Sequence, residues 1–519
     1  MARALQPTRE YHRLNGILKS LVCASSLWTR PKHCLKQLPW LLTHAREKHE
    51  ELFPQRLVLP ESKGYVPILS PTQVSSLLRS NEASEVINYN LVGQTAIRGF
   101  ESNQLASNHP TEDRRAVGKL LQTGGTVFGV YDGHGGAACA QSVSERLLDY
   151  IAVSMLSHEE LEQFSHALET DGQMDLVQRY AFANGYVSES LQEIFRTSLH
   201  RYVVENLSFA IDDLDEDQKP TDVIGCALTS AFTRLDADIS SEVVPTRGII
   251  NVDALEVGLS GACACVAHIH DLDLNVANLG DCRAVIGQLT DHGEWRPIQL
   301  TNDHKPENQK EAQRLLASHP MSESANLLKN SRLLGLLVPL RAFGDIRFKW
   351  NLHDLKVIAE FLENQFAQNL IPKNYYTPPY LFNQPEVHHY SLSRRDKFMV
   401  IGTDGLWDML SNQEVVNLVG GHLEGKLTTD RFRLKDHKDR RLGAVNMELV
   451  KRKTGLSHKG GDANCATHLI RHALGYEHRL VSDMLTFPPY ISRLYRDDIT
   501  ITIVYFDEIF LSASTPDMQ

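Results

Sequence analysis

Short apolar runs bounded by turn residues constrain the fold of this chain more than any other feature. Two of them, 262–269 and 272–279, are separated only by His270-Asp271, the spacing of an antiparallel hairpin. The last run, 499–506, alternates isoleucine with threonine, which is typical of a strand with two different faces. Stretches with helical character lie between the runs, at 137–153, 188–206 and 308–317. The pattern predicts an α+β fold in which antiparallel strands are layered with helices.

Three of the predicted strands present an aspartate at one end. Residues 126–131 lead directly into Asp132-Gly133-His134-Gly135-Gly136, residues 397–401 end just before Asp404, and Asp497 precedes the last strand. A carboxylate on a glycine-rich turn lets a metal ion approach both the side chain and a backbone carbonyl, here that of Gly133. Oxygen ligands without a Cys or His cluster favour Mg²⁺ or Mn²⁺ over Zn²⁺. One Asp-Gly alone is usually only a turn, so the prediction depends on the combination.

Composition and charge narrow the class of protein. The 519 residues are 42% hydrophobic and 23% charged, which is the balance of a soluble globular chain. No apolar run reaches the length of a membrane helix, so we expect no membrane span. Up to Arg46 there are eight basic residues and one acidic residue, and in the remainder acidic residues outnumber basic ones by 18. An acidic body argues against nucleic acid as a partner.

The basic segment up to Arg46, called the head below, has the features of a targeting segment. Leu14, Ile17, Leu18 and Leu21 are spaced along one helical face, with Arg and Lys around them, as in mitochondrial transit peptides. The alternative is an ordinary basic tail. Six of the eight cysteines lie beyond the head without any Cys-x-x-Cys pair, which fits a reducing compartment. We therefore expect the protein in the mitochondrial matrix.

Composition also divides the chain into segments. We predict a transit peptide and linker at 1–50, a linker with a short helix after Ser70-Pro71 at 51–90, one main domain at 91–508 and a tail at 509–519. Within the main domain, an insertion at about 420–465 is rich in Lys and Arg. Such a run is usually a solvated loop, and the alternative is a docking surface for an acidic partner.

Eight short motifs follow one another in the main domain. They are Glu112-Asp113-Arg114, Asp132 to Gly136, Ser260-Gly261, Asn278 to Ala284, Asp303 to Pro306, Arg341 to Asp345, Asp404 to Asp408 and Arg496-Asp497-Asp498. In this order they resemble the metal-dependent (type 2C) protein phosphatases, over most of the chain. The resemblance implies a four-layer αββα sandwich of two antiparallel sheets with flanking helices. It also implies hydrolysis of phosphoserine or phosphothreonine with two Mg²⁺ or Mn²⁺ ions and a weaker third.

The resemblance implies a role for each acidic residue of these motifs. The ligands of the two ions would be Asp132, which bridges them, the carbonyl of Gly133, Asp404 and Asp497. The residues that would orient bound water from behind the ligands are Glu112 and Asp113. The positions that can hold a third ion are Asp281 and Asp408.

The mechanism that follows from the resemblance uses water as the nucleophile. Two ions held around Asp132 would lower the pKa of a bridging water, and the hydroxide so supplied would attack phosphorus in line. His134 would protonate the departing seryl oxygen as the general acid, although an isolated histidine is more often structural. Many members carry an arginine four residues before the Glu-Asp pair, where this chain has Asn108. Asn108 is thus the candidate for phosphate binding, and its amide supplies a hydrogen bond without charge.

Several passages are similar to the branch of the family that acts on the mitochondrial pyruvate dehydrogenase complex: 100–105, 332–350, 378–381 and 495–500. This implies the phosphoserines of the α subunit of its decarboxylase component as substrate, and reactivation of the complex as the result. Calcium control and a regulatory subunit as a further partner stay open.

Three other functions compete with this interpretation. One is a phosphatase of another mitochondrial phosphoprotein, such as branched-chain 2-oxoacid dehydrogenase. Another is a catalytically dead scaffold, which would be expected to have lost the metal aspartates. A cysteine-based phosphatase is suggested by the spacing of Cys465 and Arg471, but no glycine between them opens a phosphate-binding loop.

Overall fold

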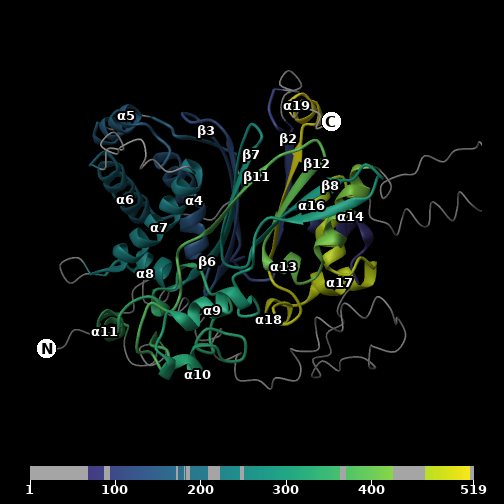
Figure 1. Cartoon of the computed structure of the whole chain (residues 1–519). Helices are drawn as coiled ribbons and strands as arrows, with labels where there is room; N and C mark the ends of the chain where they lie inside the picture. The colour runs from purple at the N-terminus through teal and green to yellow at the C-terminus, as the bar shows by residue number, and fades with distance from the viewer. Residues whose placement is uncertain are drawn as a thin grey trace, which may run out of the picture. The chain divides into compact units, whose positions relative to one another are not determined.

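The computed structural model describes residues 68–86, 94–170, 174–180, 182, 187–208, 222–245, 250–362, 370–424 and 462–514 (Figure 1). The described residues form two compact units. The first unit contains the described parts of Pro110–Ala284 and Leu300–Leu392, and the second those of Pro31–His109, Val285–Gln299 and Ser393–Gln519. The predicted transit peptide and most of the insertion at about 420–465 lie outside the described residues. Each unit has one β-sheet with its own helices, so the predicted α+β class with two antiparallel sheets and flanking helices is confirmed.

The first unit is built on a seven-stranded antiparallel sheet. Its order is β11-β7-β6-β4-β3-β5, and β10 pairs with β6 beside this path. The strands are β3 (Arg114–Leu120), β4 (Thr126–His134), β5 (Val177–Arg179), β6 (Gly261–His270), β7 (Asp273–Leu279), β10 (Phe343–Gly344) and β11 (Glu386–Ser391). After β4 the chain forms helices and the edge strand β5, and it then pairs with β4 again as β6, which puts Asp132 opposite Cys263. The sheet thereby fixes the backbone at one of the predicted metal ligands.

The predicted hairpin is confirmed as β6 and β7. The two strands pair from Ala264 with Leu279 to His270 with Asp273. Asp271 in the turn has a φ of 51°, and aspartate is one of the few residues that tolerates this left-handed conformation. Nearly every residue of β6 is buried, because a central strand is covered on both faces.

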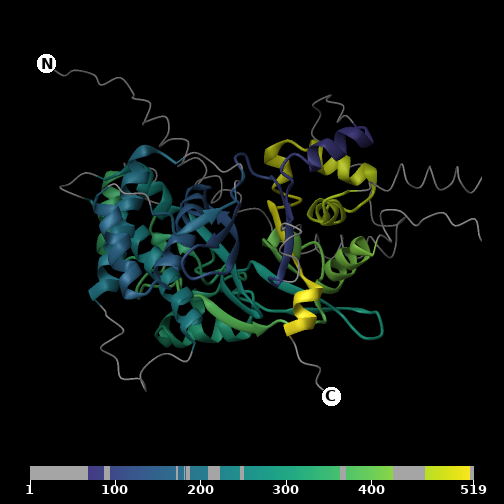
Figure 2. The same ribbon diagram turned by 90° about the horizontal axis from the view of Figure 1, so that it is seen from above.

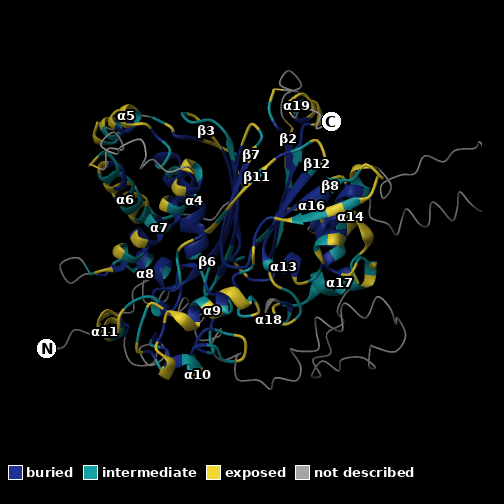
Figure 3. Cartoon of the chain, viewed as in Figure 1, coloured by how far each residue is buried: buried dark blue, intermediate teal, exposed yellow. Residues whose placement is uncertain are grey.

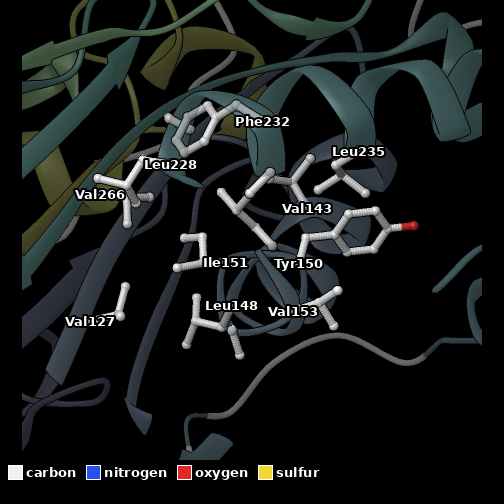
Figure 4. Close-up of a cluster of buried hydrophobic side chains, with 14 of the residues drawn as sticks. Val127, Val143, Leu148, Tyr150, Ile151, Val153, Leu228, Phe232, Leu235 and Val266 are labelled. Atoms are coloured by element: carbon white, nitrogen blue, oxygen red, sulfur yellow. The ribbon is translucent and has the colours of Figure 1, made fainter. Parts of the chain in front are cut away.

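Helices α4 (Ala138–Val153) and α7 (Val223–Val243) form the main core of the first unit with its sheet. α4 packs on β3, β4 and β6, while α7 packs on β7 and β11 and against α4. Figure 4 shows the contact, in which Ile151 of α4 and Phe232 of α7 lie between the helices and the strands. Burial of such a side chain contributes about 1.5–3 kcal/mol. The remaining helices are α5 (His158–Glu169), α6 (Glu189–Ser208), α8 (Val252–Leu259), α9 (Gln309–Ala317), η5 (Met321–Glu323), α10 (Ser324–Leu327), η6 (Ile346–Phe348) and α11 (Leu352–Phe361).

The second unit is built on a six-stranded sheet ordered β1-β2-β13-β12-β8-β9. Its strands are β1 (Ala83–Val86), β2 (Ile97–Leu105), β8 (Arg283–Leu289), β9 (Trp295–Gln299), β12 (Asp396–Gly402) and β13 (Ile499–Phe506). The predicted last strand is therefore confirmed, but both of its faces are buried. Ile501 packs into an apolar cluster, whereas Thr502 lies 3.0 Å from the hydroxyl of Ser102. The alternation thus separates an apolar buried face from a polar buried face.

Helices that are far apart in sequence lie together in the second unit. α3 (Pro71–Leu78) packs against α16 (Cys465–Ala473) and α17 (His478–Thr486), which Figure 2 shows as purple beside yellow. α3 begins as predicted, because Ser70 and Gln73 form a capping box ahead of Pro71. The other helices are α13 (Asp404–Trp407), α14 (Asn412–Leu423), α18 (Pro489–Ser492) and α19 (Glu508–Ser514).

Burial follows the same plan in both units. The strands are mostly buried, and exposed residues gather on the outer faces of helices such as α5 and α6 (Figure 3). Among the residues that the structure describes, no helix combines the length and the apolar character needed to cross a bilayer.

Two buried histidines should make the fold sensitive to acid. Burial lowers the pKa of His268 in β6 and of His468 in α16 to about 4. In the unfolded chain the value is near 6.5. Between pH 7 and 5 the unfolded chain binds the proton and the folded chain does not, so each histidine lowers the free energy of unfolding by about 2 kcal/mol. We expect His268→Leu to reduce the loss of stability measured by urea denaturation at pH 7 and 5, and an unchanged loss would refute this role.

Candidate metal centre

Two predicted site residues of the first unit lie close together. Asp132 is in β4, and Asp281 follows β7 by two residues. Carboxylate oxygens of these two residues lie within 4.8 Å of each other. Like charges at this distance repel, and a divalent cation between them relieves the repulsion. The pair is therefore a candidate set of metal ligands.

Position 133 has room only for glycine, because a Cβ atom there would lie 2.2 Å from the carbonyl oxygen of Glu112. The strand and the segment that carries Glu112 consequently approach without a side chain between them. The carboxylate of Glu112 accepts a hydrogen bond of 2.7 Å from the backbone N–H of Gly136. Asp113, the next residue, is buried. The structure thus brings Glu112 and Asp113 to the turn that carries Asp132.

Two hydrogen bonds between Gly280 and His304 fix the turn that carries Asp281. The backbone N–H of Gly280 donates to Nδ1 of His304 at 3.0 Å, and the backbone N–H of His304 donates to the carbonyl of Gly280 at 2.9 Å. The ammonium group of Lys305 lies 3.6 Å from Asp281. These contacts join the 303–306 motif to the 278–284 motif.

His134 has a partner that was not among the predicted site residues. Its Nε2 lies 2.6 Å from Oδ2 of Asp345, which follows β10. A Cβ atom on Gly261 would lie 2.1 Å from that Nε2 and 2.3 Å from that Oδ2, so Gly261 leaves the space in which the pair meets. The available signal was the motif that ends at Asp345, although nothing local linked it to His134.

The acidic surroundings favour the protonated form of His134. Burial by itself would lower the pKa of His134, but the charge and hydrogen bond of Asp345, together with the charges of Asp281 and Glu112, outweigh burial. The result is a pKa raised above 6.5. A protonated imidazole beside carboxylates that can bind metal is suited to donate a proton.

In the second unit, Asp404, Asp408 and Asp497 lie on segments that meet where β12 ends and β13 begins. Asp404 is the first residue of α13, and Asp408 follows that short helix. A Cβ atom on Gly405 would lie 2.0 Å from the carbonyl of Asp498, so glycine is required for this approach. Loss of solvation raises the pKa of Asp497, and the charges of Asp498 and Asp408 raise it further. A cation would relieve this crowding of carboxylates.

Adjacent aspartates have different tasks in this unit. Asp498 is buried, and its Oδ1 accepts the backbone N–H groups of Ser107 and Asn108. The side-chain amide of Asn108 lies 3.2 Å from Oδ2 of Asp498 and 3.4 Å from Oδ1 of Asp497. Asp498, which was not among the predicted site residues, thus anchors the loop that carries Asn108. Phosphate binding by Asn108 stays a prediction.

The donor set fits magnesium or manganese. All predicted ligands offer oxygen, and the nearby Cys263 and Cys282 do not compete as thiolates. Burial raises the pKa of both thiols well above 9, and neighbouring carboxylates, including those of Asp132 and Asp281, raise it further. Carboxylate ligands without thiolates are those that hard cations prefer.

The alternative of a cysteine nucleophile has no support in the geometry. Cys465 is buried at the start of α16, where burial raises the pKa of its thiol well above 9. Arg471 is bound to Asp462 through two hydrogen bonds of 2.7 and 2.8 Å. The thiol is protonated and therefore a poor nucleophile. The arginine is already bound to a carboxylate, and the segment is a helix instead of a phosphate-binding loop.

Comparison with known proteins gives a family and close relatives. Residues 156–436 match the family model described as Protein phosphatase 2C. The chain is 42% identical over 459 residues to human pyruvate dehydrogenase (acetyl-transferring) phosphatase 1, mitochondrial, covering 86% of this chain and 84% of the relative. It is 40% identical over 461 residues to human phosphatase 2 of the same name, covering 86% and 85%. A Saccharomyces cerevisiae relative named as phosphatase 1 is 26% identical, covering 85% and 74%.

Proposed function

Because this chain belongs to the protein phosphatase 2C family, we propose that it dephosphorylates serine residues of the mitochondrial pyruvate dehydrogenase complex. Members of the family are metal-dependent protein phosphatases, so the reaction is hydrolysis of a phosphate ester. The proposed substrate is supported by sequence identity to two human proteins that are named for this activity. The chain is 42% and 40% identical to them over 86% of its length. By the same resemblance, the target is the α subunit of the decarboxylase component, and its dephosphorylation reactivates the complex in the matrix.

The proposed ligands of two Mg²⁺ or Mn²⁺ ions are Asp132, the carbonyl of Gly133, Asp404 and Asp497. Bound there, the ions would supply a water of lowered pKa and would neutralise charge on the phosphoryl group. Glu112 and Asp113 would orient water, and Asp281 with Asp408 would hold a weaker third ion. The all-oxygen donor set and the crowding of carboxylates within each unit support this assignment.

His134 is the proposed proton donor. Cleavage of the P–O bond leaves a seryl alkoxide, a strong base that departs readily only if it is protonated. The proton on the imidazole would pass to this oxygen, and the 2.6 Å contact with Asp345 would fix the ring during the transfer. The acidic neighbours raise the pKa of His134, which favours the protonated imidazole and supports the general-acid role.

Asn108 is the proposed phosphate contact in place of an arginine. Its backbone is fixed by Asp498 at 2.8 Å, which supports a positioned amide at this place. Because the amide has no charge, the metal ions would carry most of the electrostatic stabilisation of the phosphate.

Phosphate release from the phosphorylated pyruvate dehydrogenase complex tests the proposed function directly. We expect release with Mg²⁺ or Mn²⁺ and none with EDTA, from residues 70–519. Phosphorylated branched-chain 2-oxoacid dehydrogenase and a generic phosphoseryl peptide serve as comparison substrates. Release from the peptide or the branched-chain enzyme but not from the complex would support the proposed reaction and refute the proposed substrate. No release from any of the three would favour a catalytically dead scaffold.

A further inference from the structure

The turn that carries Asp345 has an unusual backbone. Asp345 has a φ of 50° and Gly344 a φ of 66°, both in the left-handed region. A Cβ atom on Gly344 would lie 2.3 Å from the carbonyl of Ser260, which in turn accepts the N–H of Asp345 at 2.9 Å. A left-handed residue other than glycine persists only where its surroundings hold it.

A buried ion pair from outside the turn holds this backbone. Oδ1 of Asp236, on α7, accepts the N–H of Gly344 at 2.9 Å and the ammonium group of Lys349 at 2.7 Å. The same ammonium group donates to the carbonyl of Ala342 at 2.7 Å. The side chains of Asp236 and Lys349 are only 3% and 9% exposed. The pair thus binds the backbone on both sides of Phe343, immediately before Asp345.

Stability alone is a weak reason for such a pair. The loss of solvation when two charges are buried offsets much of their attraction, and apolar residues of similar volume often stabilise a fold as well. A charged pair does have one property that apolar packing lacks, because its directional hydrogen bonds fix the peptide groups that they contact. Those peptide groups are the ones that aim Asp345 at His134.

We propose that Asp236 and Lys349 are positioning residues, which fix the turn of Asp345 and through it the imidazole of His134 for proton transfer to the leaving seryl oxygen. This inference rests on the proposed function. It connects a helix in the core of the first unit to the proton donor through contacts of 2.6 to 2.9 Å at each step.

The test compares two substrates that differ in their need for a proton. A seryl oxygen needs a general acid, whereas 4-nitrophenolate leaves without one. We expect Asp236→Asn to lower kcat for a phosphoseryl peptide about tenfold or more, as part of the 100-fold or larger contribution of a general acid. The kcat for 4-nitrophenyl phosphate should change less than about twofold. Lys349→Gln should give the same pattern.

Asp238→Asn is the matched control. Asp238 lies on the same helix and is equally buried, but it pairs with Tyr150, Arg201 and Arg234 and has no contact with the turn among its described hydrogen bonds. Its substitution should affect both substrates equally. In an Asp345→Asn background, the selective loss caused by Asp236→Asn should disappear, because both residues act through the same imidazole.

Equal losses for the two substrates, or no loss for either, would overturn the inference. If neither Asp236→Asn nor Lys349→Gln folds, the pair is a stabilising element and the inference also fails. Asp132→Ala, measured in parallel, separates this failure from failure of the proposed function. Activity that survives Asp132→Ala on both substrates would sink the metal-centred reaction itself, whatever the Asp236 variant does.

Discussion

Replacing Asp132 by alanine is expected to lower phosphate release from a phosphoseryl peptide by about 1,000-fold or more at saturating Mg²⁺ or Mn²⁺. Asp132 is the proposed bridge between two ions, and loss of their electrostatic contribution would raise the barrier by about 4 kcal/mol. Substitution should leave the fold intact, since Asp132 keeps its backbone pairing with Cys263 in the sheet. Initial rates of phosphate release over a range of metal concentrations measure the effect.

The control for this prediction is Asp273→Ala. Asp273 lies in β7 of the same sheet, and its side chain is 64% exposed and forms a salt bridge with His389 on the neighbouring strand. Its loss should leave the rate within about twofold, as exposed ion pairs contribute little. Mg²⁺ should also raise the Tm of the unmodified protein and of Asp273→Ala but not that of Asp132→Ala. Metal-dependent stabilisation that survives in Asp132→Ala would show that the ions bind elsewhere.

The strands were predictable because their signals are local. The hairpin of β6 and β7 depends on two apolar runs and a turn of residues such as Asp271, all within a short stretch of sequence. The ends of strands next to Asp132, Asp404 and Asp497 were found for the same reason. Each aspartate adjoins a run whose periodicity identifies it as a strand.

Partners that meet through tertiary structure were not predictable. Asp345 reaches His134 because β10 pairs with β6, which is in turn paired with β4. No propensity or spacing describes a contact across such a sequence distance. The role of Asp236 was harder still to predict, because Asp236 is one of several polar residues on the long helix α7. Only the folded structure reveals its contact with Gly344.

Asp497 and Asp498 illustrate a limit of another kind. Both belong to one motif, and the sequence offers no physical reason to separate their roles. In the structure, Asp498 is buried against the backbone of Ser107 and Asn108, while Asp497 is the residue crowded by other carboxylates. The distinction arises from the groups that the folded chain places beside each carboxylate, which neither residue's local sequence describes.

Substitution of His134 by glutamine is expected to lower kcat for a phosphoseryl peptide about 100-fold and to leave kcat for 4-nitrophenyl phosphate within a few-fold, because only the first leaving group needs a proton. The substitution keeps a side chain that can hydrogen-bond but removes the transferable proton. A similar loss on both substrates would mean that His134 serves metal binding or folding instead.

The dependence of kcat on pH tests the contribution of Asp345 to the same step. The carboxylate of Asp345 counteracts the effect of burial and is the first of the neighbouring groups that raise the pKa of His134. A general acid works only while protonated, so kcat for the phosphoseryl peptide should fall as the pH rises through that pKa. Asp345→Asn removes the negative charge, and the fall should therefore begin at a lower pH, while the profile for 4-nitrophenyl phosphate should not move. If the descending limb stays at the same pH in Asp345→Asn, the limb reports a residue other than His134. Loss of the Asp345 charge would lower the pKa of His134 and would move a limb that His134 causes.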